Sequence, residues 1–131
     1  MLSEDLEDLL PEIDREFLLG KRYKFSASRA GADVHVIIED FPFPGTYQPR
    51  VANLLIILPA GYPNANLDMF RTIPDVRLAN GQWPVNANVR EVYAGRNWQR
   101  WSRHFGSGWR PGVDNLRSFV AAVKHELEKG I

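Results

Sequence analysis

The chain has 131 residues, of which 44% are hydrophobic, and its 16 basic residues balance its 16 acidic residues. A neutral chain of this length is expected to form a single domain, residues 1–131, without bulk attraction to nucleic acid or anionic membranes. No apolar run approaches the roughly 20 residues that span a bilayer. The acidic start of the chain is unlike a signal peptide, so we expect a cytoplasmic location.

The sequence contains no cysteine, which rules out disulfides and thiolate metal sites. Its three histidines lie in distant parts of the chain, and a metal site built from them would need all three to converge. We therefore expect no metal and no cofactor.

Two short helices are predicted at the start of the chain. Ser3 is a suitable helix cap, and Pro11 separates the residues 1–10 from a second segment over 12–19, which Gly20 ends. We expect residues 1–10 to be a mobile or docking helix, and an acidic stretch of this kind is usually a solvated helix face. The predicted apolar face of the second segment consists of Ile13, Phe17 and Leu18.

Four strands are predicted next, because apolar residues alternate over 23–30 and again over 34–38. A third strand runs from about 50 to 58. Its end, Leu54 to Leu58, is wholly apolar and predicts a strand that is buried on both faces. A fourth strand is expected near 69–72.

The last third of the chain is predicted to be an irregular segment followed by a helix. Residues 72–108 show no long periodic element. Asp114 is a plausible cap for the final helix, and Gly130 closes it. The apolar stripe of this helix is Leu116, Phe119, Val120, Val123 and Leu127. The predicted class is α+β: an N-terminal helix, a four-stranded antiparallel meander, a long irregular segment and a C-terminal helix on the sheet.

Three sequence anchors, in this order, resemble the ubiquitin-conjugating (UBC) fold. They are the flap Pro59-Ala-Gly-Tyr62-Pro63, the pair Asn80-Gly81, and Trp109-Arg-Pro111 ahead of the last helix. The segment from Trp98 to His104, with Trp109 to Gly112 behind it, resembles the prokaryotic ubiquitin-conjugating-like family E.

This resemblance implies a UBC/RWD fold whose last helix is a crossover helix. It also implies a bacterial pathway with ubiquitin-like modifiers, activating enzymes and JAB-type peptidases. The expected partners are a ubiquitin-like modifier protein and an activating-enzyme-like protein that docks on the acidic first helix.

The chain departs from that family at the catalytic position. Enzymes of the family carry cysteine three residues after the glycine of Asn-Gly, where this chain has Pro84, and the His-Pro-Asn signature has no match. We therefore expect a non-catalytic binding or adaptor module. The alternative is a conjugating enzyme whose cysteine was replaced, at Ala87 or Ala94, or one that uses His104 in acyl transfer. A plain interaction domain, unrelated to modifiers, is a third interpretation.

His104 is the sharpest candidate for chemistry, either as a general base or as a structural imidazole. Trp98 and Trp101 are three residues apart, so they would share a face in a helical turn, with arginines around them. The expected modifier-binding residues are Tyr62, Trp98, Arg100, Arg103 and His104, although the flap tyrosine of the resembling fold also packs its own loop. The expected structural residues are Trp101, Trp109 and Pro111.

Overall fold

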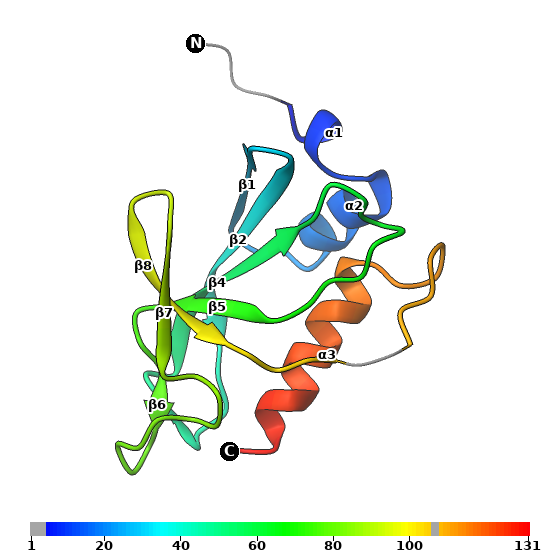
Figure 1. Cartoon of the computed structure of the whole chain (residues 1–131). Helices are drawn as coiled ribbons and strands as arrows, with labels where there is room; N and C mark the ends of the chain where they lie inside the picture. Colours follow the sequence, from blue (N-terminus) through cyan, green and yellow to red (C-terminus); the bar gives the residue numbers. More distant parts are fainter. Residues whose placement is uncertain (1–4, 106–107) are drawn as a thin grey trace.

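The computed structural model describes residues 5–105 and 108–131, and Figure 1 shows a twisted sheet with helices on one side. Ser3 lies outside the described residues. The elements in chain order are α1 (Leu6–Leu9), α2 (Glu12–Gly20), β1 (Phe25–Ala30), β2 (Asp33–Pro42), β3 (Tyr47–Gln48), β4 (Val51–Leu58), β5 (Phe70–Ile73), β6 (Arg77–Leu78), β7 (Val89–Tyr93), β8 (Arg96–Trp101) and α3 (Leu116–Glu128). Among these elements, no helix is long and apolar enough to cross a bilayer.

The main sheet is antiparallel and has the strand order β1-β2-β4-β5-β8-β7, while β3 and β6 pair separately. The predicted meander is confirmed as β1-β2-β4-β5. The expectation of only four strands was wrong, because the segment predicted to be irregular contributes β8 and β7 to the same sheet.

The β7–β8 hairpin was missed because charged residues interrupt its apolar alternation, and its turn is not the usual Asn-Gly. Ala94 and Gly95 form that turn, and both have positive φ, 52° and 74°. Two positive φ angles between paired strands define a type I′ turn, whose twist matches that of the strands.

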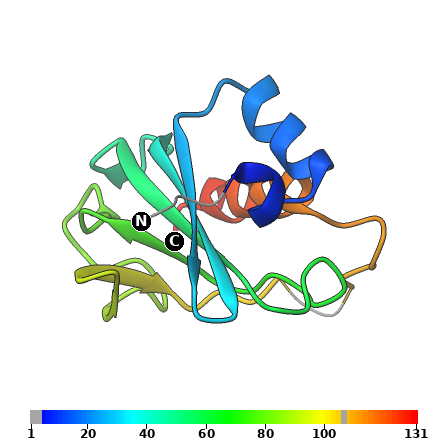
Figure 2. The ribbon, with the colours of Figure 1, turned by 90° about the horizontal axis from the view of Figure 1, so that it is seen from above.

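The core lies between one face of the sheet and the helices α2 and α3, as the view from above in Figure 2 shows. Strand β4 is buried on both faces as predicted, since Leu54, Leu55 and Ile56 are almost fully buried. Cross-strand partners share a face of a sheet. Leu55 pairs with Arg71, which pairs with Arg100, so these three residues belong to the outer face, away from the helices.

The helix boundaries and faces differ from expectation at several points. Ile13 is 54% exposed, and Asp14, at 1%, takes its place in the core. Gly20 lies inside α2, and the reversal falls on Arg22, whose φ is 58°. Asn115 caps α3 in place of Asp114, because its side chain accepts from the Ser118 amide in a capping box.

At the other end of α3, Gly130 has a φ of 68° and closes the helix as predicted.

Candidate functional site

The flap after β4 is held from two sides. The Tyr62 hydroxyl donates to Asp14 Oδ2 at 2.6 Å, and the Leu116 amide donates to Asp14 Oδ1 at 3.1 Å. On the other side, Trp109 Nε1 donates to the carbonyl of Pro63 at 2.9 Å, and the ring of Trp109 lies against that of Tyr62. One buried carboxylate therefore joins α2, the flap and the first turn of α3.

Burial raises the pKa of Asp14, although its bonds to Tyr62 and Leu116 oppose the shift. Burial also raises the pKa of Tyr62, and its bond to Asp14 adds to the shift because phenolate would face a carboxylate. The Tyr62 hydroxyl therefore keeps its proton and donates it in a hydrogen bond to Asp14. Pro111, which we expected to be a structural residue, is exposed in the turn before α3.

His104 has a partner that sequence reasoning missed. Its Nδ1 lies 3.0 Å from Asp68 Oδ1 and 2.9 Å from Oδ2. Both residues lie outside the regular elements, and 63% of the His104 side chain is exposed. With Nδ1 turned to a carboxylate, Nε2 is left to face solvent or a ligand, which is the arrangement of an oriented general base. Asp68 precedes a predicted strand by one residue, and nothing in its sequence spacing marks it as a partner for His104.

Asp68 also lines an open cleft of about 440 Å³ on the outer face of the sheet, between the flap and the β7–β8 hairpin. Arg71 and Tyr93 form its wall, and the ring of Tyr93 reaches the ring of His35 with centroids 5.4 Å apart. Ile57 contributes an apolar surface to the same cleft. The cleft thus combines a carboxylate, a guanidinium and an aromatic ring.

One carboxylate holds two arginines beside this cleft. Arg71 Nε donates to Glu91 Oε1 at 3.0 Å, and Arg100 Nη1 lies 3.3 Å from Glu91 Oε2. The Tyr93 hydroxyl donates to Glu91 Oε1 as well, at 3.1 Å. Burial raises the pKa of Glu91, but the bonds from Arg71, Tyr93 and Arg100 outweigh it and bring the pKa below its ordinary value. Burial lowers the pKa of His35.

The two tryptophans do not lie on a helical turn, as the expected shared face required. Both are in β8, where residues three apart point to opposite faces. Trp101 is fully buried in the core, and its Nε1 donates to Thr72 Oγ1 at 2.9 Å. Trp98 is also buried, with Nε1 directed at the carbonyl of Tyr93 and Arg96 over its ring.

Arg103 is a core residue, with only 3% of its side chain exposed. Its guanidinium donates to the carbonyl of Val85 at 3.1 and 3.0 Å, contacts the carbonyl of Ile131, and lies over the ring of Trp101. These bonds leave Arg100 and His104 as the accessible members of the expected modifier-binding set. Trp98 and Arg103 are enclosed, and Tyr62 is engaged by Asp14.

The positions considered for a replaced cysteine differ in access. Pro84 and Ala87 are buried, and Ala87 belongs to the core. Ala94 is exposed at the tip of the β7–β8 hairpin. A sulfur at position 87 would point into the core, whereas one at position 94 would face solvent.

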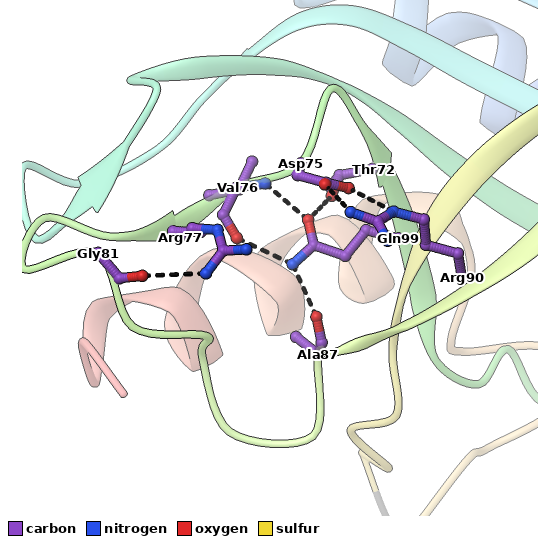
Figure 3. Close-up of polar contacts among 8 residues, drawn as sticks. All are labelled: Thr72, Asp75, Val76, Arg77, Gly81, Ala87, Arg90 and Gln99. Atoms are coloured by element: carbon purple, nitrogen blue, oxygen red, sulfur yellow. Dashed lines mark hydrogen bonds and ion pairs between the residues drawn. The ribbon is translucent and has the colours of Figure 1, made fainter.

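Gln99 organises the segment that sequence reasoning left irregular (Figure 3). Its Oε1 accepts from Thr72 Oγ1 at 3.0 Å and from the Val76 amide at 2.7 Å. Its Nε2 donates to the carbonyls of Val76 and Ala87 at 2.8 and 2.9 Å. All four hydrogen-bonding positions of this buried amide are used, so it joins β5, β8 and two loops.

Among the described residues, no group of three histidine, aspartate or glutamate side chains is placed to hold a metal ion.

The sequence profile of the family described as prokaryotic E2 family E matches residues 10–130 of the chain. Comparison with curated proteins and comparison with solved structures find no match.

Proposed function

Since the chain belongs to prokaryotic E2 family E, we propose that it is a non-covalent component of a bacterial ubiquitin-like modification pathway. In this proposal it binds a ubiquitin-like modifier or the activating enzyme and positions it for another protein to use. The observation that carries the proposal is the absence of cysteine from a chain of this family. A thioester needs a thiol, and the position that would supply it holds the buried Pro84.

The proposed contact surface is the rim of the outer-face cleft, where Arg100 and His104 are accessible. Arginine and aromatic side chains dominate binding hot spots, and Arg100 and Tyr93 both bind Glu91. Arg100→Glu should abolish modifier binding, because it places a second carboxylate next to Glu91. Lys21→Glu, on the exposed end of α2, has the same charge change and should leave binding intact.

The test mixes the protein with its cognate activating enzyme, the modifier and ATP. We expect co-elution of a complex under native conditions and no adduct on a denaturing gel. An adduct that survives denaturation would overturn the non-covalent proposal. Absence of both adduct and complex would overturn the pathway role as well.

A second candidate function follows from the His104–Asp68 pair, which supports general base catalysis of acyl transfer. The thioester would be held on another protein. A substrate amine would attack its acyl carbon, the C–N bond would form, the C–S bond would break to leave a thiolate on the carrier protein, and the amine proton would pass to His104 Nε2. His104→Gln should then slow transfer by about 10²–10⁴-fold, and Asp68→Asn should slow it by about tenfold. Both variants should still bind the modifier. Unchanged transfer rates in both variants would exclude this role.

The replaced-cysteine alternative is a conjugating enzyme that lost its thiol at position 87 or 94. Restoring cysteine at each position and repeating the adduct assay tests it directly. An adduct formed only by Ala94→Cys or only by Ala87→Cys would identify the position and favour the enzyme.

A further inference from the structure

The two edges of the main sheet are protected to different extents. At one edge, α1 contacts β1, and Arg29 of β1 donates to the carbonyl of Asp8 in α1. At the other edge, β7 pairs with β8 alone, and no further described strand lies beside it (Figure 1). An uncovered edge strand offers a row of unpaired backbone groups to another chain.

The register of the hairpin shows which backbone groups face outward. The type I′ turn at Ala94 and Gly95 makes Tyr93 and Arg96 the first pair, and such a pair exchanges both of its hydrogen bonds. Because hydrogen-bonded and non-hydrogen-bonded pairs alternate, the N–H and C=O of Arg90 and Val92 point away from β8. They form the free donor and acceptor sites of this edge.

The charged residues that would normally guard such an edge are engaged elsewhere. Arg90 forms an ion pair with Asp75, drawn in Figure 3, and its guanidinium lies 5.4 Å from the ring of Trp83. Glu91 is held by Arg71 on the outer face, and by Arg100. Charged side chains that project freely from an edge discourage pairing, and both charges of β7 are instead neutralised by neighbours.

Apart from Arg90, the exposed residues of β7 are apolar and β-branched. Val89 is 42% exposed and Val92 is 66% exposed, on opposite faces of the strand. Together with their ion-pair partners Arg71 and Asp75, the charged residues of the hairpin 89–101 are four arginines and two carboxylates, so a positive excess remains that favours negative charge. Of the described residues, no carboxylate forms an ion pair with Arg96, at the far side of the turn.

We propose that β7 is a docking edge for an extended peptide, which adds to the main sheet as a further antiparallel strand. The peptide has β-branched residues at its centre, which pack against Val89 and Val92, and acidic residues at its ends, which face the arginines of the hairpin. Its backbone bonds to the outward groups of Arg90 and Val92. This site goes beyond the proposed modifier-binding role: it shares Arg100 with that surface, but its backbone groups and the exposed Val89 and Val92 belong to β7.

The experiment uses the full chain and a labelled synthetic peptide whose centre alternates valine and threonine and whose ends carry glutamate. Binding is measured by fluorescence anisotropy. Val92→Pro removes the outward N–H without removing a bond to β8, so edge strands tolerate it. We expect its affinity to fall at least roughly tenfold, the effect of losing about 1.4 kcal/mol of binding. Val92→Thr keeps the N–H and the β-branched shape and should bind as the wild type does.

Three further measurements guard against a folding artefact. Val92→Lys, a substitution that keeps the backbone donor, should also weaken binding because it restores a free charge to the edge. Peptide binding should slow hydrogen exchange of the Arg90 and Val92 amides in the wild type. A companion peptide, N-methylated at alternate central amides, should not bind.

Equal binding by the wild type and Val92→Pro, or by the two peptides, would overturn the proposal. So would self-association of the wild type that Val92→Lys abolishes, because that would assign the edge to a second copy of this chain. None of these readouts needs the modifier or its activating enzyme, so the proposal can fail while the proposed function stands.

Discussion

Tyr62 and Asp14 are 48 positions apart in the chain and are joined by a 2.6 Å hydrogen bond inside the fold. The same carboxylate accepts from the first amide of α3, so it satisfies one of the donors that a helix start leaves free. The flap after β4 is thereby fixed to α2 and α3 through one buried acid.

Asp14→Ala should lower the free energy of unfolding by about 1–3 kcal/mol, because it leaves the Tyr62 hydroxyl and the Leu116 amide without an acceptor. Denaturant unfolding measures the loss. Glu16→Ala, on the exposed side of the same helix, should change stability by less than about 0.5 kcal/mol. The double variant with Tyr62→Phe should cost less than the two single losses together, and additive losses would show that the bond is not shared.

Asp14 also predicts how stability depends on pH. Its pKa is raised in the folded state from an ordinary value of 3.8, so over the interval between the two the folded chain binds more protons than the unfolded chain. Stability from this group therefore falls as pH rises through that interval. Asp14→Asn removes the titration, so the stability of the wild type relative to the variant should fall as pH rises above about 4, the ordinary pKa of an aspartate. A difference that is independent of pH would contradict the raised pKa.

Gln99→Ala should be among the most destabilising single substitutions in the chain. It removes a buried amide that serves Thr72, both backbone groups of Val76 and the carbonyl of Ala87. We expect a loss of about 2–5 kcal/mol, from unsatisfied groups and from the space left behind. Gln82→Ala, at an exposed position, is the matched control and should be nearly neutral. A small loss for Gln99→Ala would mean that water replaces the amide.

Cysteines introduced at positions 87 and 94 should differ sharply in reactivity. Ala94→Cys exposes its sulfur at the hairpin tip, whereas Ala87→Cys places it in the core. Under native conditions a thiol reagent should label position 87 at least ~100-fold more slowly, because labelling there requires local opening. Both should react alike in denaturant. Equal native rates would show that the Ala87 loop opens freely.

Ala94→Asn should stabilise the chain by about 0.5–1 kcal/mol, since asparagine tolerates the left-handed backbone of this turn better than alanine does. Thermal unfolding measures the gain. Ala94→Val should have the opposite effect, because a β-branched side chain is strained at positive φ. A gain for valine would argue against the type I′ turn.

Much of the fold follows from sequence patterns that depend on near neighbours. The meander, the doubly buried β4 and the stripe of α3 are each encoded in local alternation or helical spacing, and the structure confirms them. The hairpin was not predictable in the same way. Trp98 and Trp101 suit a helical turn as well as a strand, and only the pairing of Trp98 with Glu91 and of Trp101 with Phe70 decides between them.

By itself the sequence determined the α+β order of elements, the family anchors and the absence of a thiol, because these are properties of residues and their spacing. Only the tertiary structure decided the partners. Asp68 beside His104, Asp14 beside Tyr62, and Gln99 between two loops are pairings of residues far apart in the chain. Only the tertiary structure shows that Arg103 and Trp98 are buried. It also shows that β7 is the edge strand of the main sheet. Such outcomes depend on how sheet and helices pack, which local spacing does not encode.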